Sequence, residues 1–280
     1  MKKLTRKLFI SVLVAVFAFV ALGTSTYAWI TISTTAEVKA FEAKVDAGEA
    51  GIELSETGND GTWTSELALS ASDVKLDDLT TKDGKTFYNL VANGNVMSLE
   101  GTPAATGFIT KTFYIRKSPN SNGTINVVVN GSAVEFKPVG DSITATGVYN
   151  DVTAENLYAS NAARFSLAFG AEGTDVKAVY QQAAETKSTK DEWEYNGNTL
   201  DYSADGFAHK YAESQQITLP TERELPTTLA AGTDSGIVIT LAESTPVKVT
   251  LRIWIEGWDN ECHEKVLKQT FNVAFGFKVQ

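Results

Sequence analysis

Two histidines and one cysteine are the residues of this chain best suited to metal or nucleophile chemistry. The segment from His263 to Leu267 begins like the His-Glu-x-x-His helix of zinc proteases, but Leu267 stands where the second histidine ligand belongs. His209 is far away in sequence. Cys262 directly precedes His263, and adjacent residues seldom face each other as nucleophile and base. We therefore expect no enzymatic activity, and a secreted metalloendopeptidase is the alternative.

A cluster of acidic residues supplies oxygen ligands near the end of the chain. Glu256, Asp259 and Glu261 are close in sequence, and oxygen-rich loops bind calcium when their ligands converge. Their spacing does not match a helix-loop-helix calcium loop, and a solvated acidic loop would have the same sequence. We expect no cofactor, and these three residues are the candidates for calcium.

Phosphate and nucleic-acid binding are both disfavoured. Gly84-Lys85-Thr86 matches the end of a phosphate-binding loop, but Leu79 stands where that loop needs a glycine, so Asp83-Gly84 predicts a turn instead. The 34 Asp and Glu residues outnumber the 24 Lys and Arg residues, which gives a net charge of -10. A nucleic-acid surface needs clustered cations, so we expect no nucleic-acid partner.

The N-terminus has the layout of an export signal. Residues 1–28 hold four cations and no acid, and an apolar run follows the cations. This order is typical of a signal peptide, with cleavage after Ala28 and Trp29 as the new N-terminus. An uncleaved membrane anchor at residues 8–28 is the alternative. Either way we expect a secreted or cell-surface protein, and the body that remains, with 20 Lys and Arg against 34 Asp and Glu, has a net charge of -14.

The exported body is rich in strand patterns. Val247–Glu256 alternates over ten residues with one face wholly apolar, and Thr270–Val279 alternates too. We expect these two strands to pair antiparallel, each with its apolar face toward one core. The other predicted strands are residues 51–55, 107–116, 123–130, 163–169, 176–181 and 236–241.

Turn-forming residues between Arg116 and Ile125 predict a hairpin there. Residues 36–47 fit a helix through Val38, Phe41 and Val45, but the neighbouring strands favour a strand with a bulge between Ala40 and Phe41.

Many strands without alternating helices predict an all-β fold, an antiparallel sandwich over residues 29–280 that follows the signal or anchor helix. Residues 181–226 form the most polar stretch of this domain. A structureless loop of that length is uncommon, so they predict an insertion with some structure of its own.

Several of these segments together resemble a known group. They are the leader ending in Thr26-Tyr27-Ala28-Trp29, the extended stretch from Val38 to Val45, residues 51–55, and the strand and exit VKVTLRIWIEGWDNEC. The chain resembles the TasA/camelysin group of exported Gram-positive surface proteins, and more closely an uncharacterised set of Firmicutes surface proteins. The likeness covers residues 20–55 and 245–262.

The resemblance implies a jelly-roll-like β-sandwich and, as in TasA-like members, a fibre subunit of the extracellular biofilm matrix. In that group the segment after the cleavage site is donated as a strand to a neighbouring subunit. The matching positions here are Trp29, Ile30, Val38, Phe41 and Val45. We expect self-association or other surface proteins as partners. A glycan-binding or ligand-binding surface module is the remaining alternative, because Trp254 and Trp258 flank the acidic cluster.

Overall fold

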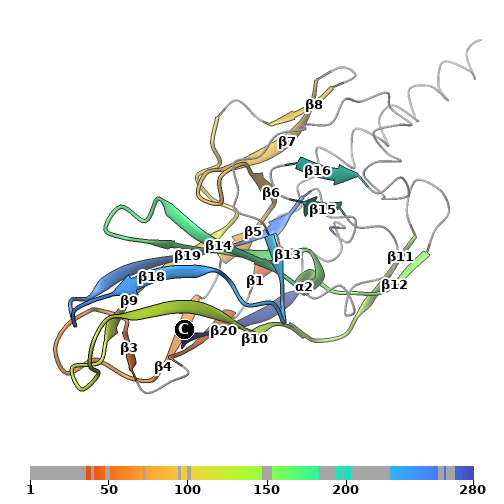
Figure 1. Ribbon diagram of the computed structural model, residues 1–280. Coiled ribbons are helices and arrows are strands. Elements are labelled where there is room, and N and C mark those ends of the chain that lie inside the picture. The colour runs from red at the N-terminus through yellow and green to blue at the C-terminus, as the bar shows by residue number, and fades with distance from the viewer. Residues whose placement is uncertain are drawn as a thin grey trace, which may run out of the picture. The chain divides into compact units, whose positions relative to one another are not determined.

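The computed structural model describes most of residues 36–280 (Figure 1). The chain divides into two compact units, residues 1–33 and 34–280. The expected leader (residues 1–28), its cleavage site at Ala28 and Trp29, and Ile30 lie outside the described residues. The described residues are 36–38, 41–47, 51–71, 74–93, 96–99, 102–146, 153–182, 193–196, 199–202, 228–257, 262 and 269–280.

Two large sheets form the domain, and the prediction of an all-β protein is confirmed. The smaller sheet has the order β18 (Ile237–Leu241), β10 (Ile125–Val139), β20 (Thr270–Val279), β2 (Phe41–Asp46) and β4 (Glu66–Ala71). The larger sheet has the order β17 (Thr228–Ala230), β14 (Asp175–Gln181), β13 (Ala163–Phe169), β19 (Val247–Glu256), β6 (Asp78–Thr81), β7 (Phe87–Asn93) and β8 (Val96–Leu99). In addition, β9 (Ile109–Lys117) pairs with β19, and β3 (Ile52–Ser55) pairs with β9.

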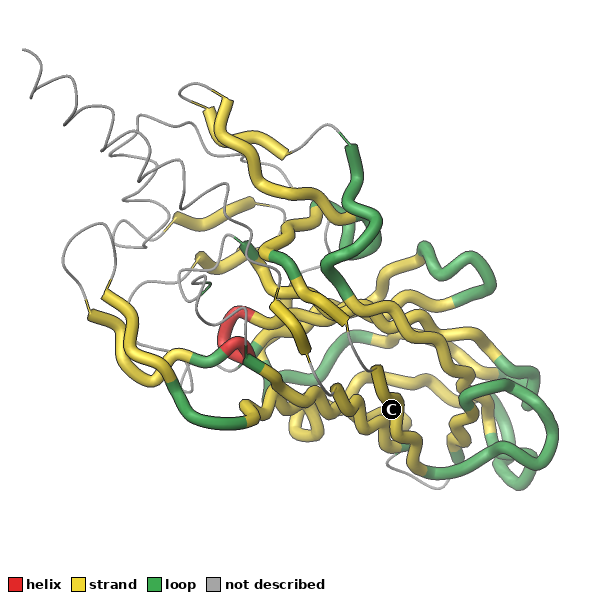
Figure 2. The backbone as a smooth tube through the Cα atoms, turned by 180° about the vertical axis from the view of Figure 1, so that it is seen from behind, coloured by secondary structure: helices red, strands yellow, loops and turns green. Residues whose placement is uncertain are grey.

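Three strand pairs lie apart from these sheets. They are β1 (Ala36–Val38) with β5 (Val74–Leu76), β11 (Ile143–Thr146) with β12 (Thr153–Leu157), and β15 (Trp193–Asn196) with β16 (Thr199–Tyr202). A single turn of helix, α2 (Ala159–Ala162), is coloured red in Figure 2. The hairpin of β15 and β16 falls inside the insertion predicted at residues 181–226.

The two large sheets pack face to face around one apolar core, which makes the fold β-sandwich-like. Phe165 of β13 stacks on Phe275 of β20 with 5.1 Å between ring centroids. Phe113 of β9 lies 6.3 Å from Phe277 of β20. Figure 1 shows β10 and β20 in one layer and β13, β14 and β19 in the other. Alternation along each strand turns these rings to the same interior, as the period of two requires.

The strand β19 lies inside the larger sheet, between β13 and β9. Its predicted apolar face, which includes Leu251 and Ile253, is buried in the core as expected. The C-terminal part of its other face is buried as well, because Trp254 packs with Phe87, 5.2 Å between ring centroids, and with Leu79 in a second small cluster. The β6–β7 hairpin therefore covers this part of the outer surface of β19.

Two pairings expected from the sequence are wrong. β19 and β20 do not pair; they lie in different sheets and face each other across the core, so the expectation of a shared core is right. β9 and β10 do not form a hairpin either, because residues 118–124 carry the chain from one sheet to the other. The buried Lys117 holds this crossing by donating hydrogen bonds to the carbonyl oxygens of Gly123 (2.7 Å) and Ala242 (2.9 Å).

Most of the predicted strands are present. Residues 51–55, 107–116, 163–169, 176–181 and 236–241 match strands β3, β9, β13, β14 and β18, and β10 extends to Val139, beyond the predicted end at residue 130. The described parts of the segment 36–47 are extended rather than helical: they form β1 and β2, and residues 39–40 between them lie outside the described residues.

Candidate functional site

The strand β2 occupies an unusual position in the smaller sheet. It runs parallel to β20 on one side, with Val45 opposite Phe275, and antiparallel to β4 on the other, with Val45 opposite Leu67. The Val45 side chain is fully buried in the core. In the smaller sheet, β2 thus separates β20 from β4.

The contacts that hold β2 are mostly backbone ones. At its end, the Ala47 N–H donates to the Ser65 carbonyl oxygen at 2.8 Å. Lys44 forms an exposed ion pair with Glu66, 3.2 Å between Nζ and Oε1. Exposed ion pairs add little to stability, so the strand ladder and the burial of Val45 hold this strand in the sheet.

The two expected assembly positions nearest to Val45 lie on the same segment. Phe41 begins β2 and is opposite Ala71 of β4 in the register. Val38 ends β1 and is opposite Val74 of β5. The segment that follows the leader therefore provides one strand to the smaller sheet and one to a separate pair.

A strand in this position can be supplied by its own chain or by a second copy. Its ladder hydrogen bonds join backbone groups, and β2, which carries the buried Val45, lies between β4 and β20. Strand addition of this kind gives affinity through the main chain and specificity through pockets for alternate side chains.

The calcium candidates are only partly described. Glu256 is buried, and its carboxylate accepts a hydrogen bond from the indole N–H of Trp254 at 3.2 Å. Asp259 and Glu261 lie outside the described residues. Within the described ranges there is no group of three or more His, Cys, Asp or Glu side chains that could hold a metal ion. The structure thus places Glu256 beside Trp254 rather than in a solvated loop.

Of the residues considered for nucleophile chemistry, the structure describes only Cys262. Its thiol is free of disulfides and buried. His209 and His263 lie outside the described residues.

At the segment that resembles a phosphate loop, Asp83 and Gly84 form the predicted turn between β6 and β7. The N–H groups of Lys85 and Thr86 donate to Oδ1 of Asp83 at 3.0 and 2.7 Å.

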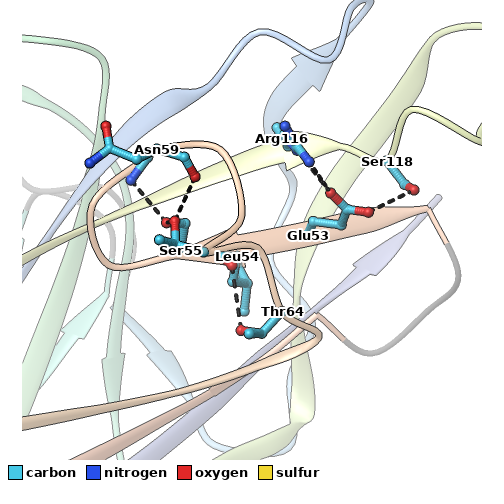
Figure 3. Close-up of polar contacts among 9 residues, drawn as sticks. Glu53, Leu54, Ser55, Asn59, Thr64, Arg116 and Ser118 are labelled. Carbon is cyan, nitrogen blue, oxygen red and sulfur yellow. Dashed lines mark hydrogen bonds and ion pairs between the residues drawn. The ribbon is translucent and has the colours of Figure 1, made fainter.

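A polar cluster joins β3 to β9, and the sequence did not point to it (Figure 3). Arg116 binds Oε2 of Glu53 through Nε at 2.8 Å and Nη2 at 2.7 Å, and the Ser118 hydroxyl donates to Oε1 of Glu53 at 3.0 Å. The guanidinium of Arg116 also lies 4.1 Å from the ring centroid of Trp63. Both carboxylate oxygens of Glu53 have partners in this cluster, so it fits a clamp that holds β3 on β9 better than a binding site.

A second feature missed from the sequence is a pair of adjacent carboxyl groups where β6 begins. Burial is the main cause that raises the pKa of Asp78 to about 6. A hydrogen bond with its own backbone lowers this pKa, and the neighbouring charge of Asp77 raises it. Burial also raises the pKa of Asp77, against the attraction of Lys75. The Asp77 carboxylate lies against Gly107, where a Cβ atom would come within 2.7 Å of Oδ2. A side chain at position 107 would thus collide with this carboxylate.

Fold and site together define an all-β, β-sandwich-like protein with β2 inserted between β4 and β20. No protein-family model, curated protein or solved structure matches the chain. No helix among the described residues is long and apolar enough to cross a membrane.

Proposed function

We propose that the protein is an exported bacterial surface or extracellular-matrix structural protein, a fibre subunit that assembles by donating its N-terminal strand to a neighbouring copy. The observation that carries the proposal is the placement of β2 between β4 and β20, parallel to β20. The same chain continues from β2 through β1 toward the basic and apolar leader, so β2 is the strand of the two large sheets that is nearest in sequence to the predicted export signal. The resemblance to the TasA/camelysin group supports the same proposal.

The strand order supports a jelly-roll-like fold as part of this proposal. Consecutive strands alternate between the two sheets at β9 and β10, β18 and β19, and β19 and β20. By contrast, β13 and β14 form a hairpin within one sheet. A chain that alternates in this way wraps both sheets around a single core, as jelly rolls do. The inserted β2 is an addition to that pattern.

The proposed location and partners follow from the leader. Cleavage after Ala28 would leave Trp29 and Ile30 at the new N-terminus, and these apolar residues would be sheltered in an assembled fibre. The protein then needs no catalytic residues or cofactor. Its main partner is a second copy of itself, and other surface proteins are further candidates.

A cross-link between β2 and β20 tests whether the strand is donated. Lys44 is opposite Ala274 in the parallel register, so cysteines at these positions lie side by side. We would combine Lys44→Cys and Ala274→Cys with Cys262→Ser, export the protein, and oxidise it. A donated strand gives a ladder of covalent oligomers on a non-reducing denaturing gel, and a strand kept in its own chain gives monomers.

The control pair is Lys137→Cys with Asn272→Cys, which joins β10 to β20 within one chain. It should give monomers in every state. N-terminal sequencing and negative-stain microscopy of the same preparation complete the test. Filaments that begin at Trp29 and give the ladder support the proposal. A monodisperse monomer, or filaments with intrachain cross-links alone, would overturn it.

A further inference from the structure

The outer edge of the smaller sheet is formed by β18, and within the described part of the chain β18 pairs with β10 alone. Its five residues, Ile-Val-Ile-Thr-Leu, include no charge, proline or glycine. Ile237 is 51% exposed, and Thr240 is exposed as well. Such an edge presents unpaired backbone N–H and C=O groups, which soluble proteins usually protect.

Three other edges of the two sheets, β4, β3 and β17, are protected in the ways expected of soluble proteins. β4, at the far edge of the same sheet, carries the charged Glu66, which pairs with Lys44. β3 is bridged by Thr64, whose backbone exchanges two hydrogen bonds of 2.8 Å with Leu54. β17 has three residues, all partly buried. Among these four edges, β18 is therefore the one that combines an uncharged sequence with exposed apolar surface.

The strand β18 is held firmly at both of its ends. Before it, the Asp234 carboxylate accepts the N–H of Gly131 at 3.0 Å, and the Ser235 hydroxyl accepts the N–H of Val129 at 2.8 Å. After it, the buried ammonium of Lys117 binds the carbonyl oxygen of Ala242 at 2.9 Å. An edge fixed in this way loses little conformational entropy when another strand is added.

The distribution of charge makes β18 a place where a second copy of the chain can approach. The exported body has a net charge of -14, so copies repel each other over most of their surfaces. The charged residues nearest to β18 in sequence are Asp234 and Glu243, and Asp234 is neutralised by an ion pair with Lys278. Two copies can therefore approach along β18 with little repulsion.

We infer that β18 is a self-association edge: two copies pair β18 with β18, antiparallel about a two-fold axis, and join two five-stranded sheets into one. The bulge opposite Val127 and Val128 distorts the first residues of β18, so the axis passes near Thr240 in the regular half. Thr240 then faces its own copy, a favourable cross-strand pair, and Ile239 faces Leu241. In this register Glu243 faces Ile237, so acidic residues do not oppose each other.

This interface is separate from the donation of β2, and both can exist in one assembly. Donation of β2 acts between β4 and β20, whereas the edge formed by β18 lies beyond β10. The inference therefore does not rest on the proposed function, and each has its own cross-link.

The first test places a charge on the edge. Thr240→Lys puts two ammonium groups opposite each other at the axis, and the fold should tolerate it because Thr240 is exposed. Analytical ultracentrifugation of the exported protein should show dimers for the unaltered chain and a dissociation constant at least about tenfold higher for Thr240→Lys. The matched control is Ser70→Lys, also exposed, on the opposite edge strand β4, which should leave dimerisation unchanged.

The second test locates the axis. Thr240→Cys combined with Cys262→Ser should form a disulfide-linked dimer on oxidation, because facing residues of an antiparallel pair lie within disulfide reach. Ser70→Cys in the same background should not. An exported protein without dimers, association that Thr240→Lys leaves intact, or absence of the Thr240→Cys dimer would each overturn the inference. A ladder from the Lys44→Cys and Ala274→Cys pair without the Thr240→Cys dimer would support strand donation alone.

Discussion

Val45 of β2 lies opposite Phe275 of β20 in parallel register, and both side chains are buried in the core between the sheets. The position of Val45 is fixed by its own strand and by both neighbouring strands. This residue therefore reports on whether β2 is seated in a sheet, whichever copy supplies the strand.

We predict that Val45→Asp destabilises the domain by more than about 3 kcal/mol, because it places an unpaired charge in an apolar core. Urea unfolding monitored by tryptophan fluorescence measures the change. The control is Lys44→Asp at the neighbouring exposed position, which replaces the surface ion pair with Glu66 by a solvent-screened repulsion between two carboxylates and should cost only about 1 kcal/mol. Equal effects of the two variants would show that β2 is not seated in the sheet in solution.

The strand content of the domain could be predicted from the sequence because period-two alternation reveals which face of a strand is buried. Val247–Glu256 is the clearest example, and its apolar face is in the core. The same pattern does not reveal the neighbouring strands. The apolar faces of β19 and β20 were expected in one sheet, and they meet instead across the sandwich. Two strands that face each other across the core and two strands that are hydrogen-bonded neighbours in one sheet show the same alternation of apolar and polar residues.

The polar features could not be predicted because their partners are distant in sequence. Arg116 and Glu53 are 63 residues apart, and neither stands out in its own segment. Trp254, considered from the sequence for a glycan-binding surface, is fully buried because the β6–β7 hairpin covers it. The insertion of β2 beside β20 likewise joins opposite ends of the domain. Local pattern carries no information about such long-range contacts.

A prediction about backbone packing concerns Gly131 of β10. A Cβ atom there would come within 2.2 Å of the Thr233 carbonyl carbon and oxygen, so Gly131→Ala must push away the loop that leads into β18. We expect a loss of about 2–3 kcal/mol in the free energy of unfolding. Gly236→Ala is the matched control, since a Cβ atom there meets nothing within 4 Å, and its effect should be within about 0.5 kcal/mol of zero. A neutral Gly131→Ala would mean that this loop does not pack on β10.

The clamp of Glu53 and Arg116 should contribute measurable coupling energy. A double-mutant cycle with Glu53→Gln and Arg116→Met isolates the pair, and we expect about 1 kcal/mol because both Arg116 nitrogens contact Oε2 of Glu53 and the contact is partly buried. The side chains of Arg116 and Glu53 are 16% and 27% exposed. The comparison pair, Lys177 and Asp175, is 41% and 61% exposed at 2.9 Å, so its cycle should give near zero. Similar couplings for the two pairs would contradict the clamp.

The last prediction concerns pH and the carboxyl group of Asp78. Its pKa is about 6 in the folded protein, raised from 3.8 mainly by burial and further by Asp77. A raised folded-state pKa means that protonated Asp78 favours the folded state. This contribution is fully present below pH 3.8 and is lost as pH rises through about 6.

Asp78→Asn should therefore stabilise the domain at pH 7, by up to about 2 kcal/mol, and have little effect at pH 4. Urea unfolding of the variant and the unaltered protein at pH 4, 5, 6 and 7 gives the difference curve. Carboxyl groups that do not interact with Asp78 act on both proteins equally and cancel in this difference, whereas Asp77 contributes to it through its charge coupling to Asp78. Asp60→Asn, at an exposed turn, is the control and should give a flat curve. A flat curve for Asp78→Asn as well would show that the folded environment does not raise the pKa of this carboxyl group.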